Sequence, residues 1–237
     1  ASITSQWFGC FPGSAEVHLG NGTSTRIDHL RVGDYVLGRS TVTGEMEPTP
    51  IVAFLHRDRH AWSPMLHVIY TIPGVAEKRR SLFLTPDHLV YVKNDNNEVQ
   101  RLRAVFASHL GRGDIIMVSS SYANKSLTEG IVLATEYATS FTEAGDFAMD
   151  LAGLYAPLTR SGSMIVNDVV VSCFAHFSDP DLSYFATWPI QWMHRLNRWI
   201  KVSESPNDLQ DGVHWLADFL LNWLTPVLPR TMFYSQT

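Results

Sequence analysis

HLRVGDYVL at residues 29–37 returns in weaker form as HLGRGDIIM at residues 109–117, which is 80 residues later. A second pair, PIVAF at 50–54 and GIVLA at 130–134, keeps the same order and the same separation. Each match is weak alone, but shared order at a constant separation indicates an internal duplication. We therefore predict two related β units, packed around a pseudo-two-fold axis.

The two parts of the chain differ in their secondary-structure pattern. Short apolar or alternating runs separated by Gly, Asn, Asp and Pro fill residues 15–175, which is typical of strands joined by turns. After Cys173 this pattern fades, and five of the seven tryptophans follow. Two apolar stripes with helical spacing are predicted there, at Leu182, Phe185, Trp192, Leu196 and Trp199, and at Val213, Leu216, Phe219, Leu220 and Trp223. The expected fold class is mainly β, with a C-terminal α-helical region.

A third pair of matching segments isolates one histidine. LTPDHLVYV at 84–92 resembles LTRSGSMIV at 158–166, now 74 residues apart, so we infer an insertion or deletion between the pairs. When the two segments are aligned, Thr85 corresponds to Thr159, whereas His88 corresponds to Gly162. The scaffold should constrain both copies alike, so the unmatched histidine is a candidate for chemistry, although a lone strand histidine is more often structural.

Composition excludes some classes of function. The 237 residues carry a net charge of −5 and only 17% charged residues, which argues against a nucleic-acid partner. Two cysteines are too few for a disulfide scaffold, though one bridge remains open. No apolar run has the length of a membrane span.

Gly9-Cys10 together with Thr85-x-x-His88 suits an N-to-S acyl shift. The Cys10 thiolate would attack the Gly9 carbonyl and convert the amide into a thioester. The amide nitrogen leaves only when protonated, so an acid must reach it; His88 could supply the proton and Thr85 could hold the amide. The alternative is that Cys10 is a small buried hydrophobe.

Six collinear segments resemble the autoprocessing C-terminal domain of hedgehog proteins, a relative of inteins with the Hint fold. They are GCFPGSAEVHL (9–19), LRVGDYVL (30–37), FLHRD (54–58), LTPDHLVYV (84–92), APLTRSGSMIVNDVVVSCFA (156–175) and GVHWLADFL (212–220). The resemblance implies a single-turnover, self-cleaving, cysteine-dependent cholesterol transferase. Cholesterol would attack the thioester through its 3β-hydroxyl and release the upstream polypeptide with a sterol ester on Gly9.

The resemblance also implies an organisation and partners. Residues 1–9 would be a remnant of the upstream cargo, 10–177 the Hint domain, and 178–237 a helical sterol-recognition region. Its sterol-binding candidates are Trp192, Trp199, Trp215, Phe219 and Trp223. We expect no cofactor, with cholesterol as co-substrate, an upstream signalling domain in cis, membrane association through the C-terminal helices, and a place in the secretory pathway, in the endoplasmic reticulum. The alternative for the aromatic stripes is simple packing on the β domain.

One residue departs from the family pattern. The family's block has an aspartate thought to deprotonate the sterol hydroxyl where this chain has His56, and Asp58 is a poor substitute. We expect a working histidine base, since neutral imidazole is competent near neutral pH. If Cys10, His56 and His88 converge, their one sulfur and two nitrogens could bind a zinc ion that inhibits the reaction. Cys173, whose strand returns close to the nucleophile in the family, is a possible redox partner of Cys10.

Three other functions compete with this one. Protein splicing needs a downstream Asn followed by Cys, Ser or Thr, but Asn167 is followed by Asp168. A cysteine hydrolase acting in trans lacks the local protease signatures. A catalytically impaired Hint domain that binds sterol or lipid is the remaining alternative, and thiol-induced cleavage after Gly9 would separate it from an active one.

Overall fold

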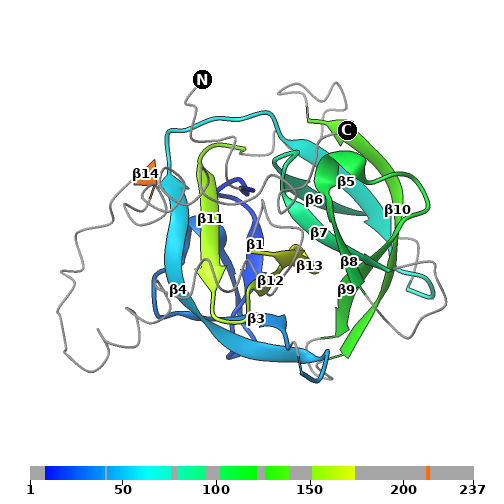
Figure 1. Ribbon diagram of the computed structural model, residues 1–237, viewed down its shortest axis with the longest axis horizontal. Coiled ribbons are helices and arrows are strands. Elements are labelled where there is room, and N and C mark those ends of the chain that lie inside the picture. Colours follow the sequence, from blue (N-terminus) through cyan, green and yellow to red (C-terminus); the bar gives the residue numbers. More distant parts are fainter. Residues whose placement is uncertain are drawn as a thin grey trace, which may run out of the picture.

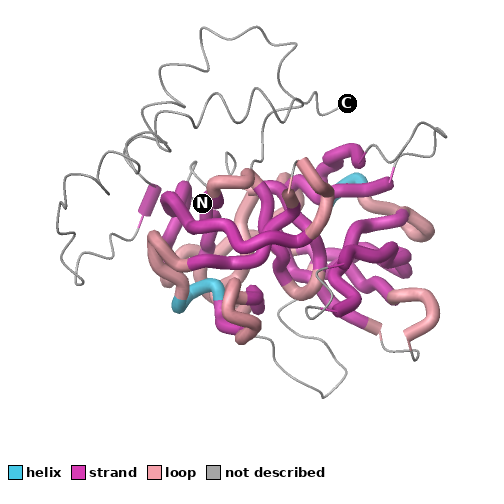
Figure 2. The backbone as a smooth tube through the Cα atoms, turned by 90° about the horizontal axis from the view of Figure 1, so that it is seen from below, coloured by secondary structure: helices cyan, strands magenta, loops and turns pink. Residues whose placement is uncertain are grey.

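The computed structural model describes most of the β-rich part of the chain. The described residues are 9–40, 42–75, 79–93, 102–121, 126–138, 151–173 and 212–213. Within them, strands are joined by turns and by two 3₁₀ helices, η2 (Ile27–His29) and η3 (Ala107–His109) (Figure 2). None of the helices in this described part is long and apolar enough to cross a membrane. The prediction of a mainly β fold is confirmed.

The strands are short except for two long ones, β4 and β10. They are β1 (Glu16–His18), β2 (Ser24–Arg26), β3 (Tyr35–Arg39), β4 (Met46–Asp58), β5 (Leu66–Thr71), β6 (Arg80–Leu84), β7 (Leu89–Lys93), β8 (Leu102–Phe106), β9 (Ile115–Ser121), β10 (Ser126–Tyr137), β11 (Leu154–Thr159), β12 (Ser163–Val166), β13 (Val169–Ser172) and β14 (Gly212–Val213).

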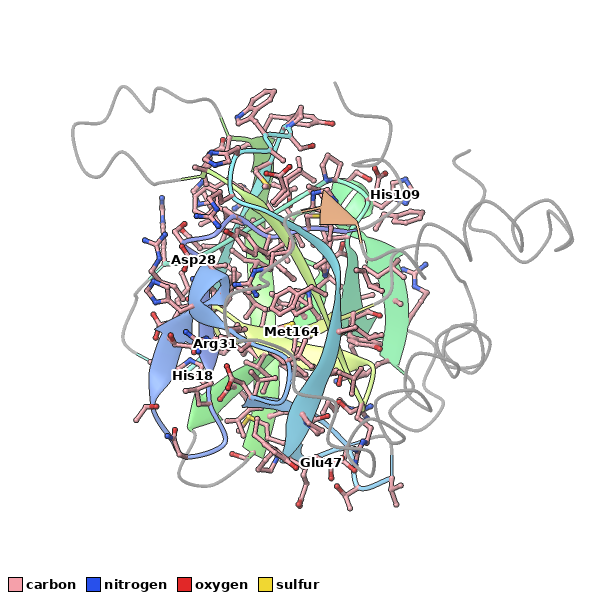
Figure 3. All side chains as sticks on the ribbon, turned by 90° about the vertical axis from the view of Figure 1, so that its left-hand side faces the viewer. His18, Asp28, Arg31, Glu47, His109 and Met164 are labelled. Carbon is pink, nitrogen blue, oxygen red and sulfur yellow. The ribbon has the colours of Figure 1, made fainter. Side chains whose placement is uncertain are left out.

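Two sheets carry these strands. The larger has the order β2-β1-β12-β13-β7-β9-β10-β5-β6, with β8 also paired to β7. The smaller has the order β11-β4-β14, with β3 also paired to β4. In Figure 1, β4, β11 and β14 lie on one side of the molecule and β5, β6 and β10 on the other. Apolar side chains fill the interior, where Met164 of β12 is 1% exposed, while the labelled Glu47 and His109 lie at its periphery (Figure 3).

The predicted duplication is present in the backbone. The η2-β3-β4 unit repeats as η3-β9-β10, and each has a turn in which an aspartate accepts a backbone N–H at 2.8 Å, Arg31 to Asp34 and Gly111 to Asp114. The glycine before each aspartate has φ of +97°, a conformation that favours glycine. The repeated Gly-Asp pair therefore encodes the same turn twice.

One expected separation was wrong by a single residue. Tyr35 pairs with Pro50, whereas Ile115 pairs with Ile131, so β4 and β10 are equivalent at a separation of 81 rather than 80. The backbone bonds agree, since Ile51 N–H donates to Asp34 and Val132 N–H donates to Asp114. A one-residue slip would turn every strand side chain to the other face, and the backbone pairing of each long strand with its neighbour fixes the register that is observed.

The turn between β12 and β13 is held by three other strands. Asn167 and Asp168 have φ of +45° and +68°, as a two-residue hairpin turn requires. The Tyr70 hydroxyl donates to the Asn167 carbonyl at 2.7 Å, and the Asp168 carboxylate pairs with Arg80 and lies 3.4 Å from His18 Nε2. This anchoring fixes the hairpin whose far end reaches the candidate site.

The predicted helical C-terminal region lies mostly outside the described residues and so stays a prediction. Residues 178–211 and 214–237, with both aromatic stripes apart from Val213, lie outside the described residues. Gly212 and Val213 form strand β14 on the edge of β4 rather than the start of a helix. Backbone pairing with β4 was not visible in the side-chain spacing that predicted the helix.

Candidate active site

Cys10 lies in the core at the start of the described chain. It is 0% exposed, and burial raises the pKa of its thiol to about 12. The next residue, Phe11, exchanges two backbone hydrogen bonds with Tyr155 of β11, at 2.9 and 3.0 Å. The nucleophile candidate is therefore a neutral thiol at physiological pH, fixed by a strand-like contact one residue away.

The Thr85–His88 turn contacts Cys10 on both sides of its α-carbon. The Cys10 N–H donates to Thr85 Oγ1 at 2.9 Å, and the Thr85 N–H donates to the Cys10 carbonyl at 2.9 Å. The first of these groups is the nitrogen of the Gly9–Cys10 peptide bond. The structure thus places Thr85 on the amide that the sequence analysis assigned to it.

His88 closes the turn and is buried, 3% exposed. Its Nε2 lies 3.0 Å from the Ser172 carbonyl oxygen, which can only accept, so Nε2 carries the proton and donates. In the neutral ring Nδ1 then has the free lone pair, and within the described residues it makes no hydrogen bond that meets normal geometry. Burial lowers the pKa of His88 to about 4, against smaller opposing contributions from the Ser172 and Gly9 backbones.

Gly9 packs directly on the imidazole. A β-carbon on Gly9 would lie against His88 Nδ1 and 2.7 Å from both Cα and Cγ of His88, closer than real contacts allow. Only glycine fits without moving the ring. The residue before the nucleophile is therefore small because the histidine occupies the space of its side chain.

His56 lies on β4 in an environment without polar partners. It is 4% exposed, and neither ring nitrogen has a hydrogen-bond partner among the described residues. Burial lowers the pKa of His56 from its ordinary value of 6.5, and the Asp58 charge opposes this. Asp58 itself accepts the backbone N–H groups of His60 and Ala61, at 2.8 and 3.0 Å. Asp58 therefore caps the local backbone, and its weakness as a base remains a prediction.

Cys173 lies next to the carbonyl that His88 contacts. Both cysteines are free thiols in this structure. Cys173 Sγ is 3.4 Å from Thr159 Oγ1, its N–H donates to Gly162, and burial raises the pKa of its thiol to about 11. A Cys10–Cys173 disulfide under oxidation remains a prediction.

The proposed zinc set is not assembled. Among the described residues, which include Cys10, His56 and His88, no three His, Cys, Asp or Glu side chains are placed to hold a metal ion. Strand β11 lies between β4 and the Cys10 segment, which keeps His56 away from the other two. The sterol-binding candidates Trp192, Trp199, Trp215, Phe219 and Trp223 lie outside the described residues.

Three contacts of the site were missed from the sequence. They are the Ser172 carbonyl, the Tyr155 pairing beside the nucleophile, and the β14 backbone on His56. A backbone acceptor or a strand partner has no signature in residue type, so only the position of Ser172 beside Cys173 offered a hint.

Comparison with known proteins finds a matching family model and several relatives. The family model described as "Hint module" matches residues 1–229. Indian hedgehog protein of Gallus gallus is 34% identical over 229 residues, covering 95% of this chain and 50% of that protein. Protein hedgehog of Drosophila melanogaster is 26% identical, covering 98% of this chain and 46% of that protein. The chain spans about half the length of these curated relatives.

Solved structures show the same fold. An intein from a hyperthermophile covers 69% of this chain and 99% of its own, with a TM-score of 0.52 and 13% identity. The Ssp DnaB mini-intein variant M86 covers 70% and 94%, with a TM-score of 0.50 and 12% identity. At these identities the likeness extends to the fold alone.

Proposed function

Because this chain belongs to the family of Hint modules, we propose that it breaks its own Gly9–Cys10 peptide bond through an internal thioester. The observation that carries the proposal is the Thr85–His88 turn, which holds the Cys10 amide nitrogen at 2.9 Å while His88 packs on Gly9. Family membership and the hedgehog relatives support autoprocessing in general. The cysteine dependence and the sterol acceptor are the finer parts of the proposal.

The first step moves one proton from sulfur to nitrogen. With pKa values of about 12 for the Cys10 thiol and about 4 for His88, both groups are neutral near pH 7. His88 Nδ1 accepts the thiol proton as sulfur attacks the Gly9 carbonyl carbon, and the resulting imidazolium gives that proton to the Cys10 nitrogen as the C–N bond breaks. Thr85 holds the nitrogen within reach. Because burial lowers the pKa of His88, its imidazolium form is a strong acid and gives up the proton readily.

The second step transfers the acyl group to an alcohol. His56 accepts the hydroxyl proton, the alcohol oxygen attacks the thioester carbonyl of Gly9, and the C–S bond breaks to leave the Cys10 thiolate, which takes up that proton. A base must be unprotonated at working pH, and the lowered pKa of His56 meets this condition. Resemblance to hedgehog proteins makes cholesterol the alcohol, and no cofactor is needed.

The remaining parts of the proposal rest on the relatives. Residues 10–177 would form the autoprocessing domain and 178–237 the sterol-recognition region, which would associate with membranes. The upstream polypeptide would be a signalling domain in cis, and the reaction would take place in the secretory pathway. A catalytically impaired, sterol-binding Hint domain is the second candidate, favoured by the substitution of histidine at position 56.

The test is a fusion with a reporter upstream of residue 1. Dithiothreitol should release the reporter with a C-terminal Gly9, and cholesterol should release it with the mass of a sterol ester. Cys10→Ala is the control and should stay intact in both. A parent fusion that stays intact in dithiothreitol would contradict the thioester and leave the impaired sterol-binding domain as the better function.

A further inference from the structure

Cys10, Ala156 and His56 lie in one row across neighbouring strands. Phe11 pairs antiparallel with Tyr155, so the preceding residue, Cys10, lies opposite the following one, Ala156. Ala156 in turn pairs with His56 of β4, and the β14 backbone continues the row on the far side of His56. Residues directly opposite each other in an antiparallel pair point to the same face of the sheet.

The row puts a single methyl group between the thiol and the imidazole. Adjacent strands lie about 5 Å apart, so the α-carbons of Cys10 and His56 are separated by about 10 Å, with the Ala156 side chain between them. Among the described residues, neither side chain belongs to a group of three ligands placed to hold a metal ion. The separation of their α-carbons is suitable for a third group that touches both side chains.

The unpartnered nitrogens of His56 indicate what such a group must supply. Buried polar atoms normally have a hydrogen-bond partner, yet both ring nitrogens of this 4% exposed histidine lack one among the described residues. A hydroxyl group lying over Ala156 would donate to one of them. The same hydroxyl would then face the thioester formed on Cys10.

We propose that Ala156 is a specificity-determining residue, whose small side chain sets the room for the attacking alcohol between Cys10 and His56. This inference rests on the proposed function and names the place where its second nucleophile is positioned. The alcohol loses its proton to His56, its oxygen bonds to the Gly9 carbonyl carbon, and the bond from that carbon to Cys10 sulfur breaks. A bulkier side chain at position 156 would fill the space of the hydroxyl and the ring carbons beside it.

The experiment compares three variants, Ala156→Gly, Ala156→Val and Ala156→Leu, in the full-length reporter fusion. The measured quantity is the ratio of the cholesterol-transfer rate to the dithiothreitol-cleavage rate, which cancels any general loss of thioester formation. Ala53→Val is the matched control, because Ala53 is also a buried β4–β11 alanine, 3% exposed and paired with Leu158, but lies outside the row.

We expect the ratio to fall about 10-fold or more for Ala156→Val and further for Ala156→Leu, since one methylene in a substrate site changes rates by about 10- to 200-fold. Ala156→Gly and Ala53→Val should keep at least the parent's ratio. An unchanged ratio in Ala156→Leu, or an equal fall in Ala156→Gly, would overturn the inference alone. A parent that forms the thioester but attaches no cholesterol would overturn the proposed sterol transfer and this inference with it.

Discussion

The two Thr-x-x turns of the duplicated fold share one backbone hydrogen bond but differ in their surroundings and at their last residue, where Gly162 has φ of +74° and His88 does not have a positive φ. In the first, the His88 N–H donates to the Thr85 carbonyl at 3.1 Å; in the second, the Gly162 N–H donates to the Thr159 carbonyl at 3.2 Å. Thr85 Oγ1 accepts the N–H of the scissile bond, whereas Thr159 Oγ1 donates to the Ser163 carbonyl at 2.8 Å.

The threonine that both turns share and the histidine that only the first turn has are therefore present for different reasons. A threonine suits the turn itself, because its hydroxyl bonds whichever backbone group lies above it. The ring of His88 instead packs against Gly9, and within the described part of the chain its Nδ1 has no hydrogen-bond partner of normal geometry. Comparison of the two turns separates what the scaffold requires from what the chemistry requires.

The largest effect is expected at the two cysteines. Cys10→Ala should abolish both thiol-induced and sterol-induced cleavage, because no other group can hold the acyl chain. Cys173→Ala, in the second copy, should keep cleavage within about 3-fold of the parent, since its thiol interacts with the Thr159 hydroxyl rather than with the scissile peptide. Gel-resolved cleavage of the fusion measures both, and full loss in Cys173→Ala would mean that the second thiol takes part.

His88→Ala should slow thiol-induced cleavage about 10²–10⁴-fold, the usual contribution of a positioned acid or base. Gly162→Ala is its counterpart and should instead reduce the free energy of unfolding by about 1 kcal/mol, because φ is +74° there. Cleavage rates and urea unfolding distinguish the two effects. Cleavage by His88→Ala at the parent's rate would remove the histidine from the mechanism.

A third difference is that β4 carries a buried histidine while its counterpart β10 has none. His56→Ala should keep thiol-induced cleavage but lose most sterol transfer. In the parent, sterol transfer should fall as the pH drops through the pKa of His56, since only the neutral ring is a base. An ordinary histidine would put this midpoint in the range of about pH 6–7. Burial lowers the pKa below 6.5, so the midpoint should lie at the acidic side of that range or below it.

Rates of sterol transfer between pH 4.5 and 8, as test conditions, check this for the parent and for His56→Asp. The aspartate variant should move the midpoint further down, because a carboxyl group has an unperturbed pKa of about 3.9. Sterol transfer by His56→Ala at the parent's rate would show that the base lies elsewhere.

The smallest effect is expected for the two threonines. Thr85→Val removes the acceptor of the scissile N–H, and one hydrogen bond of about 1–1.5 kcal/mol corresponds to about 10-fold slower thiol-induced cleavage. Thr159→Val removes a similar bond that goes to the Ser163 carbonyl rather than to the scissile peptide, so it should lower stability by about 1 kcal/mol with little change in rate. Equal rates in the two variants would show that Thr85 only supports the turn.

The main features of the candidate site could be predicted from sequence because each has a local signature. Gly9-Cys10 is a small residue before a thiol, and the Gly-Asp turns repeat with a positive φ that few other residues tolerate. The predicted separation of β4 and β10 was one residue too short because sequence matches between β-strands are weak. The register of Ile131 is fixed by its pairing with Ile115, which the sequence does not show.

Sequence by itself determined which groups are available: a thiol after a glycine, a histidine missing from the second copy, and a histidine in place of an acid at position 56. The tertiary structure alone decided their states and their spacing. Burial makes the Cys10 thiol and the His88 ring neutral, because both charged forms lose hydration in the core. The row through Ala156 exists only because strands distant in sequence pair side by side, and backbone pairing leaves no mark on residue type.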